Sequence, residues 1–310
     1  MGNTMRRLGL RLANLAKRVV GAVASFVTVW LLKALRRTDP DRLADRAGRF
    51  MQRVGPYLRE HRVGRANLAA AFPEKSHDEI EAILGGVWNN LGRFGGEFAH
   101  LDRMSIVDPD DPQPSNIDYS PDTLRIFRRL RDDGKPGLIF TAHLANWELP
   151  ALVATAYGLR TAILYRAPNI EGIANAVQDI RAVNMGTLIQ ANHAAAVNLA
   201  AALERGEHVA MLVDQYFYQG IDVQFFGRPA RTNPLIARLA RHFDCPIHGT
   251  RVVRLGGRQF RNELTEEIVP PRDAEGLIDV QGTMQAITSV IEGWVREHPE
   301  QWLWLHRRWR

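Results

Sequence analysis

Apolar runs of strand length alternate with stretches of helical spacing over the second half of the chain. The strand-like runs cover residues 138–141, 161–165, 186–190, 208–213 and 247–254. The helical stretches cover residues 123–131, 148–157, 170–183, 194–204 and 234–242. This order predicts an α/β fold, a layered domain with a mostly parallel central sheet flanked by helices. Ligands in such folds bind beyond the carboxyl ends of the strands.

A helical lead-in precedes this pattern. Residues 41–58 place apolar side chains at helical spacing as far as Gly55-Pro56. Ser76 with Glu79 resembles a capping box, and it predicts a helix running to about His100. A loop rich in proline and aspartate follows at residues 108–114. We therefore divide the chain after the N-terminus into a helical lead-in, 38–120, and an α/β catalytic part, 121–310, which together form one domain, 38–310.

The N-terminus differs from the rest of the chain. Residues 1–18 carry five basic and no acidic side chains, and residues 19–32 are uncharged. A run of fourteen is shorter than the ~20 residues of a usual membrane span, although flanking basic residues can extend it. The segment lacks the small-x-small cleavage site of a signal peptide. A buried core helix is the alternative, but cations on both sides favour a hydrophobic anchor helix over residues 1–37, spanning the membrane or lying in its interface.

Composition narrows the function classes. The 310 residues are 45% hydrophobic and 24% charged, which excludes disorder and a polytopic membrane protein. The net charge of +6 favours an anionic partner, either lipid, nucleic acid or a phosphorylated substrate. Because the basic residues are scattered and no recognition module is present, we expect no nucleic acid. The single cysteine, Cys245, excludes an internal disulfide, and we predict a buried structural thiol.

Two predicted strand ends carry polar side chains. His143 and Glu148 follow the run 138–141, and Asp214 follows the run 208–213. If His143 ends the loop and Glu148 lies in the first helical turn, the carboxylate can hold the imidazole, which is the arrangement of a general base. Asp214 would face the same edge of the sheet, to support His143 or to order the loop. A capping histidine and a first-turn glutamate are the structural alternative.

Other chemistries lack their motifs. The sequence contains no GxSxG, HExxH, Walker or GxGxxG pattern. It also lacks a spaced set of His, Asp and Glu near His143, so we expect neither a catalytic metal nor another cofactor. Without a motif for a protein nucleophile, direct attack of an acceptor group on the substrate is then the simplest mechanism.

Several segments in order resemble one family. The chain contains, in this order, HLANWE after an apolar strand, LYRAPN, DQ, VQFFGRPARTNPLIARLA and the terminal HPEQWLWLHRRWR. This series resembles the bacterial lipid A biosynthesis acyltransferases, the lauroyl and myristoyl transferases. RANLAAAFPEKS extends the resemblance towards the N-terminus. The family lies within the lysophospholipid acyltransferase superfamily, for which the HxxxxE spacing alone is typical. The FFGRPA block and the QWLWLHRRWR ending are more specific to the lipid A enzymes.

The resemblance implies roles for particular residues. His143 matches the family's general base, Glu148 its orienting acid, and Asn146 a position that shapes the turn. Arg166 and Arg181 fall where the family places positive charge, which suits a substrate phosphate or a developing oxyanion, although exposed structural arginines are the alternative. The FFGR segment at 225–228 is expected either to line an acyl channel or to be core and turn.

The resemblance also implies a reaction and a location. It implies transfer of a fatty acyl chain from an acyl carrier protein thioester to a hydroxyl of a phosphorylated glycolipid, the lipid A precursor, at the cytoplasmic face of the inner membrane. Acyl-CoA is the alternative donor. Another glycolipid or a lysophospholipid is the alternative acceptor, and a non-enzymatic protein that binds the anionic membrane surface is the alternative function. The C-terminal tryptophans are expected either to lie at the membrane or to complete the core while their neighbouring arginines face water.

Overall fold

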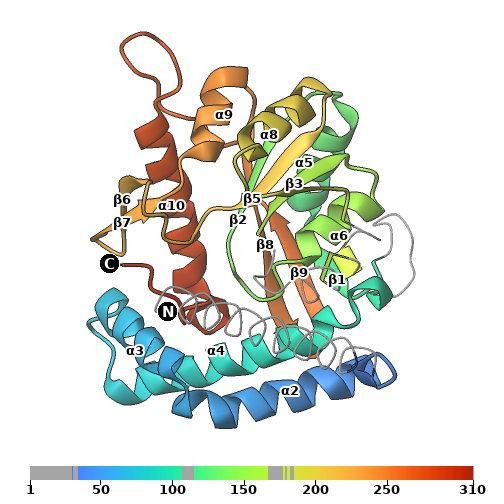
Figure 1. Ribbon diagram of the computed structural model, residues 1–310, viewed down its shortest axis with the longest axis vertical. Helices are drawn as coiled ribbons and strands as arrows, with labels where there is room; N and C mark the ends of the chain where they lie inside the picture. Colours follow the sequence, from blue (N-terminus) through green and yellow to red (C-terminus); the bar gives the residue numbers. More distant parts are fainter. Residues whose placement is uncertain are drawn as a thin grey trace, which may run out of the picture.

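A seven-stranded sheet forms the centre of the molecule (Figure 1). The computed structural model describes residues 30, 34–106, 115–166, 177–178, 180–181 and 185–309. The strand order is β1-β9-β8-β2-β5-β3-β4. Their bounds are β1 Ile117–Tyr119, β2 Leu138–Thr141, β3 Thr161–Tyr165, β4 Thr187–Gln190, β5 His208–Leu212, β8 Ile247–Gly256 and β9 Gln259–Leu264.

Five neighbouring strands of this sheet are parallel, as the sequence predicts. These are β8, β2, β5, β3 and β4. β9 turns back against β8 through Gly256 and Gly257, whose positive φ angles of 147° and 55° suit glycine, and β1 pairs parallel to β9. The sequence-based description omitted β1, β9 and a separate hairpin, β6 (Ile221–Phe225) with β7 (Arg228–Thr232).

Helices cover both faces of the sheet. Along β2, Leu138 and Phe140 face one hydrophobic cluster, and Ile139 faces the other, as the period of two requires. α5 (Pro121–Asp132) and α6 (Leu149–Ala156) cover the Ile139 face. α8 (Ala195–Glu204), α9 (Leu235–Phe243) and α10 (Val280–Glu297) cover the opposite face (Figure 1).

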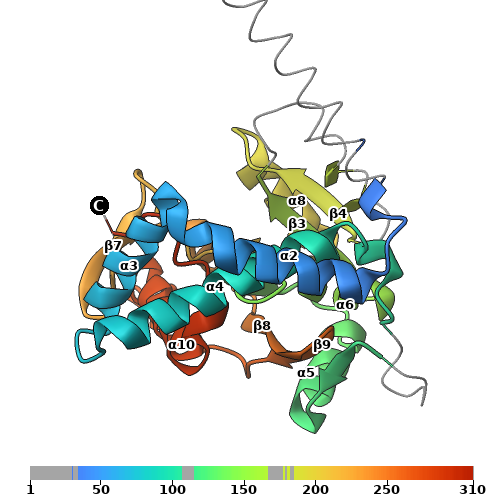
Figure 2. The same ribbon diagram turned by 90° about the horizontal axis from the view of Figure 1, so that it is seen from below.

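The helical lead-in lies across one end of the sheet (Figures 1 and 2). Its main helices are α2 (Pro40–Val54), α3 (Arg59–Ala71) and α4 (His77–Phe98), with a short 3-10 turn at Gly55–Tyr57. The end of the segment 38–120 forms β1, so it joins the sheet instead of being helical throughout. The predicted capping box is confirmed, because Ser76 and Glu79 bond reciprocally at the start of α4. Gly55 lies at the C-terminal end of α2, in close contact with the ring of Trp88. A larger residue would not fit there, because its Cβ would lie 2.2 Å from that ring. The sequence-based description missed α3.

The C-terminal segment completes the core. After the 3-10 turn Pro299–Gln301, Trp302 and Trp304 are fully buried, and they lie beside Phe225 and Phe226 of the β6–β7 hairpin. Trp302 and Trp304 therefore complete the core. Phe225 and Phe226 are also buried, and they belong to the core and to the hairpin turn. The neighbouring arginines were expected to face water if the tryptophans complete the core. Arg307 is exposed, but this expectation was wrong for Arg308, which is only 2% exposed and donates from its guanidinium to the carbonyl of Arg231.

Most of the predicted N-terminal anchor lies outside the described residues. Of residues 1–37, the structure describes 30 and 34–37. Within the described parts of the chain, no helix combines the length and the apolar character of a membrane span.

Candidate active site

The turn that joins β2 to α6 carries His143 and is held from several sides. The C-terminal segment pairs with it, since the amide of Leu303 donates to the carbonyl of His143 at 3.1 Å and the amide of Ala145 to that of Gln301 at 2.9 Å. Ala145 has a φ of 45°, a left-handed conformation that is unfavourable for alanine. Strained backbone of this kind persists where its surroundings fix it, commonly at functional sites.

Asp214, two residues beyond the end of β5 at Leu212, holds the imidazole of His143. Its Oδ1 lies 2.7 Å from Nδ1 of His143, and its Oδ2 accepts from the His143 amide at 2.8 Å. Nε2 of His143 lies 3.2 Å from the side-chain nitrogen of Gln215. Both contacts favour the tautomer with the proton on Nδ1, because a carboxylate accepts and an amide NH₂ donates. Nε2 then carries the lone pair of a general base.

The carboxylate of Asp214 is charged despite its burial. It is 3% exposed, and Nε1 of Trp302 donates to Oδ2 at 2.8 Å. Burial raises its pKa, but the charge of His143 and the hydrogen bonds from His143 outweigh burial and hold the pKa of Asp214 well below its usual value. A fixed negative charge beside Nδ1 stabilises the imidazolium that forms when Nε2 takes a proton.

Glu148 contacts an arginine, which differs from the expected pairing with His143. Both carboxylate oxygens accept from Arg181: Oε2 from Nε at 2.9 Å, and Oε1 from Nη2. Glu148 is 6% exposed, so the pair is largely removed from water. Glu148 occupies the N-cap position of α6 without a capping hydrogen bond from its side chain, and its carboxylate lies beside Arg181 rather than on the imidazole. The carboxylate on His143 is that of Asp214.

A second buried network fixes the same turn from the helical lead-in. Asn146 is fully buried and donates from Nδ2 to Glu97 of α4 at 2.9 Å, and its Oδ1 accepts from the Glu148 amide at 3.3 Å. Glu97 is also fully buried and forms two contacts with Arg254 of β8. Asn146 therefore belongs to the hydrogen-bond network that holds the turn. The sequence did not indicate that Glu97, Arg254 and Trp302 contribute hydrogen bonds to this site.

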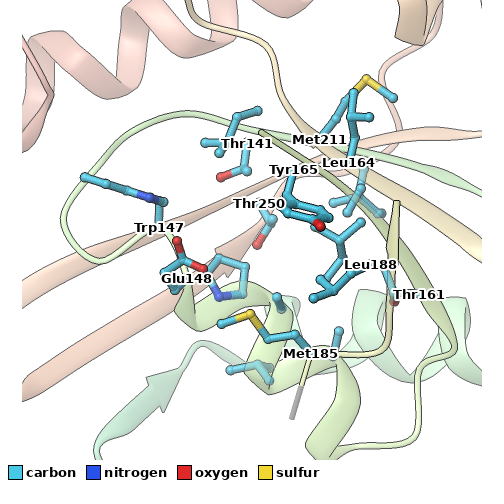
Figure 3. A pocket seen from close by; sticks show the side chains of 18 of the residues that line it. Thr141, Trp147, Glu148, Thr161, Leu164, Tyr165, Met185, Leu188, Met211 and Thr250 are labelled. Atoms are coloured by element: carbon cyan, nitrogen blue, oxygen red, sulfur yellow. The ribbon is translucent and has the colours of Figure 1, made fainter. Parts of the chain in front are cut away.

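A cavity of about 480 Å³ opens at His143 and extends between the sheet and helices α5 and α6. His143, Trp147, Glu148, Arg166, Arg181 and Gln215 line it. Apolar side chains line its remainder, among them Phe127, Ile139, Ala154, Leu159, Ile163, Leu188 and Met211. Figure 3 shows Trp147 and Glu148 at one side of the cavity, with Tyr165, Leu188 and Met185 gathered around it. A pocket of this kind fits an elongated apolar group with a polar head.

The predicted site residues divide by position. His143, Glu148, Arg166 and Arg181 line the cavity, and Asp214 and Asn146 lie behind its wall. Arg166 is exposed and has no acidic neighbour within ion-pair distance among the described residues. Across those residues, no three or more His, Cys, Asp or Glu side chains are grouped as metal ligands. Cys245 is a buried free thiol, as predicted.

The family model for the bacterial lipid A biosynthesis acyltransferases matches residues 13–310. The chain belongs to this family. Among curated proteins, none matches the chain. Since the family transfers acyl groups, the protein is an acyltransferase of lipid A biosynthesis.

Burial of His306 gives this region a pH-dependent stability. Burial lowers the pKa of His306 to about 4, because the charged form is disfavoured away from water. Between about pH 6.5 and 4 the unfolded chain binds more protons, so the free energy of unfolding falls by roughly 3 kcal/mol as pH drops. Chemical denaturation of the parent and of His306→Phe at several pH values would measure this. If the free energy of unfolding changed equally with pH in both proteins over this window, His306 would not be the source of the pH dependence.

Proposed function

We propose that the protein moves a fatty acyl chain from an acyl carrier protein thioester to a hydroxyl of a lipid A precursor. The observation that carries the proposal is the position of His143, whose Nε2 lies at the mouth of an apolar cavity while Asp214 binds Nδ1. The cavity would take the acyl chain, and the polar residues at its mouth would surround the thioester and the attacking hydroxyl.

The chemistry follows from these contacts. The acceptor hydroxyl would replace Gln215 at Nε2 of His143, since the Gln215 side chain is exposed and free to move aside. Nε2 takes the hydroxyl proton as the oxygen attacks the thioester carbonyl, and Asp214 stabilises the resulting imidazolium. The carbon–sulfur bond then breaks, and the imidazolium returns the proton to the thiolate. The products are an ester and the free thiol of the carrier.

Arg181 supplies a positive charge to the same cavity. Its guanidinium lines the cavity and is held by both oxygens of Glu148. Two bonds to one carboxylate fix the plane of the guanidinium, so its remaining N–H groups have a defined direction. We assign Arg181 to the developing oxyanion, with Glu148 as its positioning residue. Arg166, which is exposed and has no acidic partner among the described residues, would bind a phosphate of the acceptor or of the donor.

Analysis of membrane lipid tests the proposed acceptor. Deletion of the gene should remove one secondary acyl chain from lipid A, seen by mass spectrometry, and the parent gene should restore it. Complementation with His143→Ala should not restore it, while a matched substitution at a distant exposed site, Arg238→Gln, should. An unchanged lipid A with an altered phospholipid profile would favour a lysophospholipid acceptor. No change in any lipid would favour a binding protein.

The donor and the location are testable in the same system. A purified enzyme that uses acyl carrier protein should transfer faster from that thioester than from acyl-CoA of the same chain length. We also propose attachment to the cytoplasmic face of the inner membrane through residues 1–37.

Removal of residues 1–37 should shift the protein towards the soluble fraction. It should also lower activity on vesicle-borne acceptor more than on detergent-dispersed acceptor, because only the first requires attachment. Fractionation at low and high salt measures the remaining binding, which should weaken with salt if it rests on basic residues. Pelleting of the shortened protein at high salt would place the anchoring surface in the folded domain.

Metal removal should leave the reaction unchanged. The proposed steps use an imidazole, a carboxylate and a guanidinium, none of which requires a bound ion. Incubation with EDTA followed by gel filtration should therefore leave the rate of acyl transfer at the level of an untreated sample. Loss of transfer that returns with added zinc would contradict this mechanism.

A further inference from the structure

The outer face of α2 carries a row of exposed arginines. Arg42, Arg46, Arg49 and Arg53 are all exposed. At 100° per residue they fall within an arc of about 60°, along roughly 16 Å of helix. Within the described parts of the chain, no carboxylate lies at ion-pair distance from any of them. We call these four residues the arginine row.

The acidic residues of α2 point to other elements. Asp45 pairs with Arg93 of α4 at 2.6 Å, and Asp41 lies 3.5 Å from Arg258 in the turn between β8 and β9. Asp39 caps the helix by accepting from the Arg42 amide. Positive charge is thus concentrated on the outward face, while negative charge is used for internal contacts. The surface favours a partner that supplies many negative groups over an area.

Exposed aromatic side chains flank the row. Phe50 is 61% exposed and follows Arg49, and Tyr57, just beyond the helix end, is 88% exposed. Aromatic rings beside arginines are typical of helices that lie in the headgroup region of a membrane, where rings enter the interface and guanidinium groups bind phosphates.

The row is rigidly connected to the candidate active site. The inner face of α2 packs closely on α4: a Cβ at Gly92 would lie 2.3 Å from the carbonyl oxygen of Ala47. Farther along α4, the Phe94 ring stacks on Trp147, with centroids 3.9 Å apart. Trp147 belongs to the turn that joins β2 to α6 and carries His143, which we call the catalytic turn. Figure 2 shows α2 alongside α4, with the strands of the sheet beyond them. A partner on the arginine row would therefore be one helix layer from the turn.

We propose that the arginine row is the surface on which the folded domain rests against an anionic lipid bilayer, with lipid phosphates as its ligands. The exposed aromatics favour a bilayer over an acidic protein. The chain order also favours it, since the basic and apolar residues 1–37 directly precede α2. The inference rests on the proposed membrane location and adds the orientation of the domain, with the catalytic turn towards the lipid.

An environment-sensitive fluorophore on α2 tests this orientation in the full chain. Cys245 is the only cysteine and is buried, so Phe50→Cys supplies a single accessible thiol for an NBD label. The label should shift to the blue with vesicles of phosphatidylcholine and phosphatidylglycerol. The shift should be smaller with phosphatidylcholine alone and should decrease with salt. A label at Val197→Cys on α8, 70% exposed, should not shift.

Charge reversal identifies the arginines as the cause. Arg46→Glu with Arg53→Glu should abolish the shift of the label at position 50. Arg160→Glu with Arg238→Glu makes the same change of net charge at exposed sites and should preserve it. Circular dichroism would establish that both variants fold. An equal shift in both double variants, or no shift with anionic vesicles, would overturn the proposal.

The same label also tests whether the arginine row binds an acidic protein instead of lipid. A shift produced by purified acyl carrier protein but not by anionic vesicles would make the row a protein-docking surface and overturn the bilayer assignment. The measurement contains no acyl transfer, so its failure would leave the proposed reaction standing. Loss of acyl transfer with a normal shift would contradict the reaction alone.

Discussion

Replacement of His143 by alanine should lower kcat/KM for acyl transfer by roughly 10²–10⁴-fold, the usual contribution of a positioned general base. The imidazole is the group in the cavity lining whose Nε2 can take a hydroxyl proton, and its Nδ1 is already bonded to Asp214. Transfer from a purified thioester donor to detergent-dispersed acceptor is the measurement, since it separates chemistry from membrane attachment.

The control for this variant concerns folding. Removal of the ring leaves Asp214 buried with the His143 amide and Trp302 as its remaining donors, so some loss of thermal stability is expected. His143→Gln retains a polar side chain in the same place and should be equally inactive but more stable. Near-normal transfer by a folded His143→Ala protein would remove His143 from the mechanism.

The centre of the fold was predictable because its signals are local. Each of the strands β2, β3 and β5 is a short, mainly apolar run, and burial on both faces of a parallel sheet produces that pattern. The β9 strand was missed because it lies towards the edge of the sheet and alternates. Phe260 and Asn262 are buried while Gln259 is exposed, and such a short polar-apolar alternation resembles a loop. The α10 helix had adequate helical spacing and could have been predicted.

The candidate site was predictable in its membership but not in its pairings. Strand ends brought His143, Glu148 and Asp214 to one edge of the sheet, which follows from parallel topology. Which carboxylate reaches the imidazole depends on the path of the turn, and that path is set by Gln301 and Glu97 from distant parts of the chain. Sequence spacing carries no information on such contacts, and a buried glutamate such as Glu97 has no distinguishing local pattern.

Asp214→Asn and Glu148→Gln should separate the two possible partners of His143. In Asp214→Asn, the new NH₂ group must face either the His143 side chain or the donors that Oδ2 now binds, the His143 amide and Trp302. If it faces the imidazole, Nδ1 must become the acceptor and the proton moves to Nε2, which abolishes the base. A comparable change in a serine protease triad costs about 10⁴-fold in kcat, and we expect a loss of that order.

Glu148→Gln should leave the imidazole as it is. Its carboxylate bonds to Arg181, so the change weakens the hold on the guanidinium and lowers kcat through the oxyanion instead. Nitrogen NMR of selectively labelled histidine distinguishes the variants. The His143 signals should move to the Nε2–H tautomer in Asp214→Asn and keep the Nδ1–H pattern in Glu148→Gln. A tautomer change in Glu148→Gln with none in Asp214→Asn would show that Glu148 holds the imidazole during catalysis.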